Sequence, residues 1–248
     1  MNTHTIRAAR VLAPNDLRLI WRDGFLLSFI MFALPIMCLA LRWLAPYVGE
    51  IVAEWVVLEP YYGLILASFI VAGQPVMLGF VIGILFVEER DEGTLMALQA
   101  SPLSLRSFLS YRLLVAMGLN VVLTTMGVYF SGLVAVSLLE TLAAVALASL
   151  GVPLVALFYA IFIKNKVQAL MMLKPVQIWG GLPVVLFFTP TPWQWIGSVP
   201  GPLYYPMRLF WSASQGQAEW WLILPGLIIP GVAILWLLRR FEHTINAG

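Results

Sequence analysis

The sequence is short of charged residues, cysteine and histidine. Only 10% of its 248 residues are charged, against about 25% in an ordinary soluble domain. A single cysteine, Cys38, can form neither an intrachain disulfide nor a cysteine-based metal site. The two histidines, His4 and His243, lie at the extreme termini, outside every apolar segment. A catalytic or metal-binding histidine within a membrane is therefore excluded.

Apolar residues, by contrast, are abundant and make up 61% of the chain. A water-soluble globule of this size cannot hide that much apolar surface, because a large share of its residues must face solvent. The ordinary soluble enzyme and the disordered protein are both excluded. The apolar runs are continuous rather than alternating, which excludes a membrane β-barrel. The sequence therefore predicts an all-α integral membrane protein.

Six apolar segments are long enough to cross the hydrocarbon layer, which takes about 20 residues of helix. We predict one transmembrane domain over residues 1–248, with spans at 25–45, 61–87, 113–139, 141–163, 167–188 and 220–238. Six spans put both termini on one side. That side holds all of the fourteen lysines and arginines except Arg42 and Arg208. By the positive-inside rule both termini are cytoplasmic, in a multi-pass protein of the inner (plasma) membrane.

Two flanking segments have distinctive patterns. In residues 1–23, arginines alternate with apolar residues, which suits an amphipathic segment at the inner membrane surface or, equally, an ordinary cytoplasmic flank. Residues 189–219 contain five prolines and several tryptophans and tyrosines but almost no charge. Because such aromatic residues favour the membrane interface, we expect an external, re-entrant-type segment. Whether it gates a pathway or caps the bundle stays open.

The chain carries no internal source of energy for uphill transport. No carboxylate falls in the middle of a predicted span, although ion-driven transporters usually need ionisable groups there. No G-x-x-x-x-G-K-[ST] phosphate loop occurs. The chain is therefore not expected to be an enzyme, and any nucleotide hydrolysis must take place on a separate subunit.

The loop between the second and third predicted spans, residues 88–107, is the most informative segment. An acidic run ends at Gly93-Thr94, and threonine can cap a helix start. Leu95 and Leu98 then share one face of a short helix, which Ser101-Pro102 ends. Such an apolar-faced helix suits a groove on a cytoplasmic partner, although a solvated turn fits the same pattern.

This loop resembles that of the membrane subunits of ABC type-2 exporters. The matching order is Glu-Arg-acidic-x-Gly-Thr-Leu, followed by a leucine and Ser-Pro. With the preceding glutamate, the residues that the resemblance assigns to coupling are Glu88, Glu89, Arg90, Asp91, Gly93, Thr94, Leu95, Leu98, Ser101 and Pro102. The resemblance implies a coupling helix that docks on an ATP-binding cassette subunit. It also implies a second permease subunit, identical or paralogous, with ATP and magnesium on the ATPase partners and no cofactor or metal here.

The resemblance also implies that the substrate path runs between two permease subunits, lined mainly by spans two and five. The residues expected there are Phe69, Gln74, Met77, Phe80, Gln177 and Trp179. They suit a hydrophobic or amphipathic, drug-like or lipid-like compound, although helix packing explains them equally well. The leading hypothesis is an export permease embedded in lipid, with no nucleic-acid partner. The alternatives are an ATP-independent secondary transporter or channel for a neutral solute, and an assembly factor.

Overall fold

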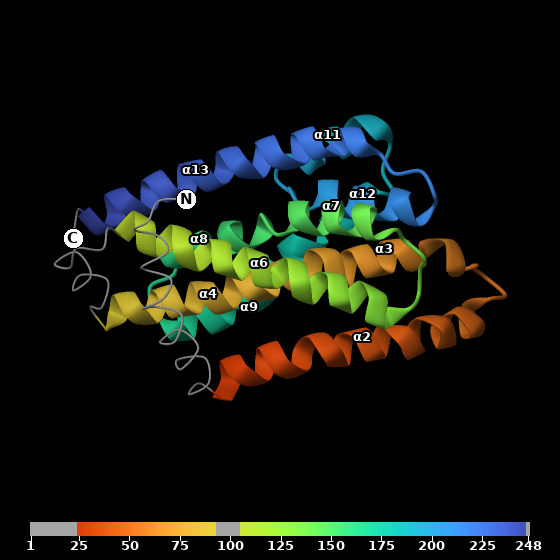
Figure 1. Cartoon of the computed structure of the whole chain (residues 1–248), viewed down its shortest axis with the longest axis horizontal. Coiled ribbons are helices and arrows are strands. Elements are labelled where there is room, and N and C mark those ends of the chain that lie inside the picture. Colours follow the sequence, from red (N-terminus) through yellow and green to blue (C-terminus); the bar gives the residue numbers. More distant parts are fainter. Residues whose placement is uncertain (1–23, 93–104, 247–248) are drawn as a thin grey trace.

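The computed structural model describes residues 24–92 and 105–246, which are almost entirely helical (Figure 1). Within these ranges no residue forms a strand, which confirms the all-α class. The elements are α2 (Gly24–Val52), η1 (Glu59–Tyr61), α3 (Tyr62–Leu66), η2 (Ala67–Ala72), α4 (Gly73–Asp91), α6 (Leu105–Ser131), α7 (Leu138–Ala148), α8 (Gly151–Phe162), α9 (Lys166–Gly181), α10 (Pro183–Leu186), α11 (Thr191–Ser198), α12 (Tyr204–Ser214), η3 (Trp220–Leu222) and α13 (Ile223–Asn246).

The described helices are those of a multi-pass membrane protein. Five stretches in this part of the chain are long and apolar enough to cross a bilayer: Glu59–Asp91, Phe108–Ser131, Leu138–Phe162, Lys166–Leu186 and Trp220–Phe241. The first predicted span, 25–45, lies inside α2, whose side chains are described only from Ile36 onward. The amphipathic segment predicted over 1–23 lies outside the described residues.

The second span is the centre of the bundle. Its α4 portion packs most closely on α8, and two glycines allow that approach. A Cβ atom on Gly79 would lie 2.6 Å from the Cβ of Val155, and one on Gly83 would lie 2.6 Å from the Cβ of Tyr159. Small residues on one helix let its neighbour pack closely, which is how apolar helices associate in lipid.

The third predicted span, 113–139, was placed too far along the chain. Helix α6 begins at Leu105 and ends at Ser131, where Gly132 takes a φ of +62° and stops the helix. Ser137 then caps α7, with Glu140 completing a capping box three residues later. Glu140 is therefore in the first turn of α7. The break was hidden because residues 133–136 are themselves apolar.

Other boundaries also differ from expectation. Span two runs to Asp91, so the first residues of the predicted loop 88–107 are helical; their charges find partners on neighbouring helices, as described below. The fifth span, predicted over 167–188, is divided into α9 and α10 at Leu182, just before Pro183. The external segment 189–219 contains two short helices, and α12 packs against span two and α7 inside the bundle.

The helices form an elongated bundle with two distinct ends (Figure 1). The start of α2 and the ends of α4 and α13 lie at one end of the bundle, on the left of the view. The end of α2 and helices α3 and α12 lie toward the other end. Arg90 and Arg240 are thus at the opposite end from Arg208.

Candidate functional site

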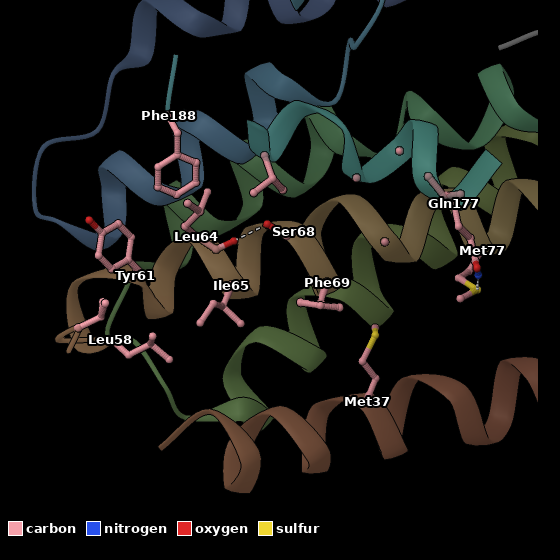
Figure 2. A pocket seen from close by; sticks show the side chains of 16 residues that line it. Met37, Leu58, Tyr61, Leu64, Ile65, Ser68, Phe69, Met77, Gln177 and Phe188 are labelled. Carbon is pink, nitrogen blue, oxygen red and sulfur yellow. Dashed lines mark hydrogen bonds between the residues drawn. The ribbon is translucent and has the colours of Figure 1, made fainter. Parts of the chain in front are cut away.

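A cavity of about 920 Å³ lies between α2, the second span and the α9–α10 segment. We call it the α2–α9 cavity (Figure 2). Its volume falls in the range of about 300–1,000 Å³ that ligand pockets occupy. Its lining residues are almost all apolar or small: Met37, Val56, Leu58, Tyr61, Leu64, Ile65, Ser68, Phe69, Gly73, Val76, Met77, Gln177, Gly180, Gly181, Val184 and Phe188.

The second span is irregular where it lines this cavity. Residues Ala67–Ala72 form a π-helix between the α-helical segments α3 and α4. Ser68 and Phe69 lie in this π-helical stretch, and its C-cap, Gly73, also lines the cavity. A π-helical segment within an α-helix is rare and is often found at functional sites. Phe69 lines the cavity from this stretch, with about half its surface exposed (53%).

Few polar groups face the cavity, and no charged residue is among those lining it. The Gln177 Nε2 donates a hydrogen bond to the Met77 sulfur at 3.5 Å, so spans two and five are joined across the cavity wall (Figure 2). The Ser68 hydroxyl donates to the Leu64 carbonyl at 2.6 Å. Because a thioether sulfur is a weak acceptor, the Gln177 amide can exchange this partner for a ligand, whereas the rest of the wall offers dispersion and hydrophobic contact.

The structure brings together three of the six predicted path residues: Phe69, Met77 and Gln177. Gln74 is buried away from the cavity. Phe80 is fully buried, packs edge-on against the Tyr159 ring with 5.4 Å between centroids, and does not line this cavity. Trp179 lies on another face of α9, where its Nε1 donates to the Pro200 carbonyl at 3.0 Å.

Sequence reasoning missed the contribution of the first span and of the glycine pair. Met37 lines the cavity from α2. Gly180 and Gly181 line it from α9 and, having no side chains, leave its volume unfilled there. A Cβ on Gly181 would meet nothing within 4 Å, so no backbone contact forces a glycine there. A glycine pair inside an apolar span is a signal that sequence could have supplied.

The charged motif at the end of α4 makes its contacts inside the bundle. Glu88 pairs with Lys166 of α9, with 2.5 Å between Oε1 and Nζ. Glu89 accepts a 2.6 Å hydrogen bond from the Arg112 guanidinium of α6, and both side chains are nearly buried. Arg90 donates to three carbonyls at the end of α8, those of Ala160, Ile163 and Lys164. Each of these three consecutive residues of α4 therefore contacts a different helix.

These contacts change the expectation for the coupling residues. Glu88, Glu89 and Arg90 connect α4 to α9, α6 and α8, where the resemblance assigned them to the surface facing an ATPase. Asp91 is exposed, as the resemblance expects of a residue that faces a partner subunit. Its Oδ1 lies 3.9 Å from the Arg90 Nη2. The remaining coupling residues lie outside the described residues: Gly93, Thr94, Leu95, Leu98, Ser101 and Pro102.

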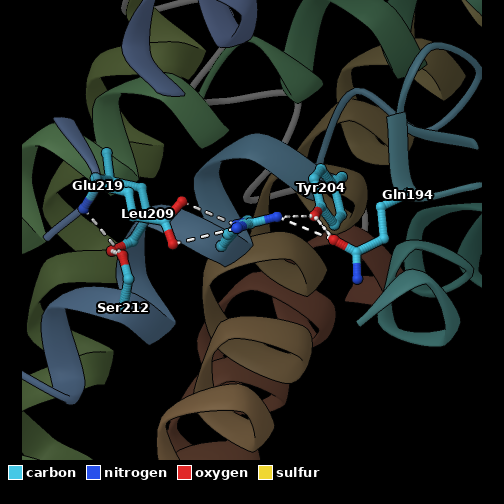
Figure 3. Close-up of polar contacts among 6 residues, drawn as sticks. Gln194, Tyr204, Leu209, Ser212 and Glu219 are labelled. Atoms are coloured by element: carbon cyan, nitrogen blue, oxygen red, sulfur yellow. Dashed lines mark hydrogen bonds and ion pairs between the residues drawn. The ribbon is translucent and has the colours of Figure 1, made fainter. Parts of the chain in front are cut away.

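A second polar cluster joins the two short helices of the external segment to the start of the last span (Figure 3). The Arg208 Nε and Nη2 donate to the two carboxylate oxygens of Glu219, at 3.0 and 3.2 Å. Its Nη1 donates to the Tyr204 hydroxyl at 2.7 Å and to the Gln194 amide oxygen at 3.0 Å. Burial raises the pKa of the Tyr204 hydroxyl above its ordinary value, while the Arg208 contact opposes that shift. We call these four residues the arginine cluster.

Comparison with known proteins identifies the family. A family model described as "Fluoroquinolones export permease protein Rv2686c-like" matches residues 16–239. The chain belongs to the Rv2686c-like export permease family. Two similar relatives are the fluoroquinolones export permease proteins MT2760 and Rv2686c of Mycobacterium tuberculosis strains CDC 1551 and H37Rv. Each is 30% identical over 241 residues, which cover 95% of this chain and 94% of the relative. No solved structure matches.

Membership of the Rv2686c-like family confirms the resemblance to type-2 exporter permeases that rests on the first cytoplasmic loop. It also establishes the general class of the protein, a multi-pass membrane permease for export. The α2–α9 cavity and the contacts at the end of α4 are thus features of an export permease.

Proposed function

We propose that this chain is the membrane-spanning subunit of an ATP-driven exporter for amphipathic, drug-like compounds. The observation that carries the proposal is the α2–α9 cavity, an uncharged apolar chamber in a chain whose relatives are named fluoroquinolones export permease proteins. A flat aromatic compound would contact the rings of Tyr61, Phe69 and Phe188, while Gln177 offers a hydrogen bond. Methionine side chains adapt to ligands of different shape.

The proposed topology has six spans and cytoplasmic termini in the inner membrane. Helix α2 has 29 residues, about 43 Å at the α-helical rise of 1.5 Å per residue. That length exceeds the hydrocarbon thickness of about 30 Å, so α2 supplies the sixth span. In this proposed topology the ends of α4 and α13 are inside and the arginine cluster is outside, which the distribution of lysines and arginines supports.

The proposed energy source is an ATP-binding cassette subunit that binds ATP and magnesium. The full sequence lacks a phosphate loop. The coupling residues that the resemblance assigns beyond Glu92 follow directly after α4 in the sequence. A force applied there would act first on α4, which contacts α6, α8 and α9 through Glu88, Glu89 and Arg90. The same α4 continues into the π-helix at the cavity. A second permease subunit, identical or paralogous, completes the proposed assembly.

Transport by reconstituted protein tests this function. The chain and its co-purifying partners are placed in proteoliposomes, and uptake of a fluorescent fluoroquinolone is measured with and without ATP. We expect uptake only with ATP, several-fold reduced by Met77→Ala in the cavity wall. Met126→Ala, on the exposed face of α6, is the matched control and should leave uptake unchanged. Equal uptake without ATP would support the ATP-independent transporter and contradict the proposal.

A further inference from the structure

A second cavity of about 430 Å³ lies over α8, on a different face of α9 from the α2–α9 cavity. We call it the α8–α9 groove. Helices α8 and α9 supply most of its wall, and one residue of α13 completes it. The lining residues are Leu154, Val155, Phe158, Met172, Pro175, Val176, Trp179 and Leu237. All eight are apolar or aromatic, so the groove suits a hydrocarbon chain rather than a polar solute.

The groove lies in the half of the bundle that ends at the cytoplasm in the proposed topology. Phe158 is four residues before the end of α8 at Phe162, which is about 6 Å along a helix axis. Met172 is six residues after the start of α9 at Lys166, about 9 Å along the axis. An acyl chain of the inner leaflet occupies this depth.

A cation and two aromatic rings stand at the cytoplasmic mouth of the groove. The Arg240 guanidinium lies 4.8 Å from the Phe162 ring centroid and 5.4 Å from that of Trp236. The Phe162 ring in turn lies 5.3 Å from that of Phe158, which lines the groove. Leu237, also in the wall, precedes Arg240 by one turn of α13. The Arg240 guanidinium is therefore connected to the apolar groove wall through the stacked rings of Phe162 and Phe158.

A further cation follows the end of α8. Lys164 comes two residues after Phe162, whose ring contacts the Arg240 guanidinium, and is exposed. The anionic surface of the cytoplasmic leaflet attracts such cations. Arginine at the edge of an aromatic stack can donate several hydrogen bonds to a phosphate while its plane stays on the ring. A groove with an apolar interior and cations at its mouth is complementary to an amphiphile that has a hydrocarbon tail and an anionic head group.

We propose that the α8–α9 groove binds an anionic phospholipid of the inner leaflet, with an acyl chain in the groove and the phosphate at Arg240. The proposal rests on the proposed topology but not on the transport cycle. The bound lipid would brace α9 from the side opposite the α2–α9 cavity. Pro175, inside α9, lies in the groove wall, so the lipid would contact the helix where its backbone hydrogen bonding is interrupted.

Photo-crosslinking tests the proposal on the full-length chain with its co-purifying partners. The protein is reconstituted in phosphatidylcholine nanodiscs containing a few per cent of phosphatidylglycerol with a diazirine on one acyl chain, and labelled peptides are mapped by mass spectrometry. We expect labelling concentrated on residues 154–158 and 172–179. Arg240→Gln should lower it about fivefold, from the loss of one cation at an anionic surface. Arg239→Gln, the matched control one residue away, should lower it much less.

A second variant guards against misfolding of Arg240→Gln. Met172→Trp fills the groove from α9 while leaving Arg240 in place, and it should also abolish the concentrated labelling. Equal labelling from diazirine phosphatidylcholine, or equal effects of Arg239→Gln and Arg240→Gln, would overturn the proposal. Loss of the label on addition of the exported drug, with lipid label elsewhere unchanged, would assign the groove to cargo and also overturn it. None of these readouts depends on transport, so failure here leaves the proposed function intact.

Discussion

Glu89 and Arg112 form an ion pair with 2.6 Å between Oε2 and Nη1, joining the end of the second span to the start of the third. Arg112 is 3% exposed and lies over the rings of Phe86 and Phe108, at 5.4 and 4.9 Å. A pair this buried is costly to break, because each ion has left water. The pair therefore ties the end of α4 to the start of α6.

The Glu89–Arg112 pair predicts that substitutions at the two positions affect the free energy of unfolding in a coupled way. Glu89→Gln or Arg112→Gln should each lower the free energy of unfolding by about 3 kcal/mol, since the remaining charge is left buried without its partner. The double variant should cost less than the sum of the two, as residues in one ion pair are not additive. Thermal unfolding in detergent measures the cycle. Additive losses would show that the two residues are not energetically coupled.

The same variants separate the two interpretations of the motif. If Glu89 transmits force within the bundle, Glu89→Gln should leave ATPase binding intact and lower the ratio of drug transported to ATP hydrolysed. Glu92→Gln, an exposed position just beyond α4, is the control and should keep that ratio. Loss of co-purifying ATPase in Glu89→Gln would instead show that this carboxylate is part of the docking surface.

The close packing of α4 on α8 predicts that alanine lowers stability at a glycine in this contact but not at a glycine elsewhere. Gly83→Ala would bring a methyl group to 2.6 Å from the Tyr159 Cβ, so the helices must separate. Overpacking of this kind should cost about 2 kcal/mol. Gly118→Ala, in α6, meets nothing within 4 Å and should be neutral or slightly stabilising. Melting temperatures of the two variants compare them directly, and equal values would contradict the observed packing.

The arginine cluster predicts local loosening of the external segment. Arg208→Gln removes the paired hydrogen bonds to Glu219 and the contacts to Tyr204 and Gln194. Because the ion pair is partly exposed, the global loss should be only about 1 kcal/mol. Backbone hydrogen exchange should rise over residues 191–219 and stay unchanged in α4. Exchange that rises equally in both regions would show that the cluster supports the whole bundle.

The uncharged wall of the α2–α9 cavity predicts sensitivity to charge. Gln177→Glu would place a carboxylate in an apolar chamber, where ionisation is unfavourable. It should lower drug resistance of the host more than Gln177→Leu does, and the minimal inhibitory concentration of a fluoroquinolone measures this. A Gln177→Glu variant with full resistance would argue against passage of the compound at this wall.

Sequence predicted the helical class and most of the spans because both follow from apolar composition and length. It misplaced the end of the third span, since Gly132 breaks the helix within a run that hydropathy does not interrupt. It found Phe69, Met77 and Gln177 on the cavity wall but included Phe80, because periodicity cannot distinguish a face turned to a cavity from one turned to Tyr159. The inward pairing of Glu88, Glu89 and Arg90 depends on residues 23 to 78 positions away, beyond the reach of a local motif.

The most direct measurement of the central claim is ligand protection inside the α2–α9 cavity. In a Cys38→Ser background, Phe69→Cys and the control Met126→Cys are each labelled with a small membrane-permeant maleimide, with and without an excess of a fluoroquinolone. The account predicts that the compound slows labelling at position 69 several-fold and leaves position 126 unchanged. Equal labelling rates at position 69 with and without the compound would contradict it.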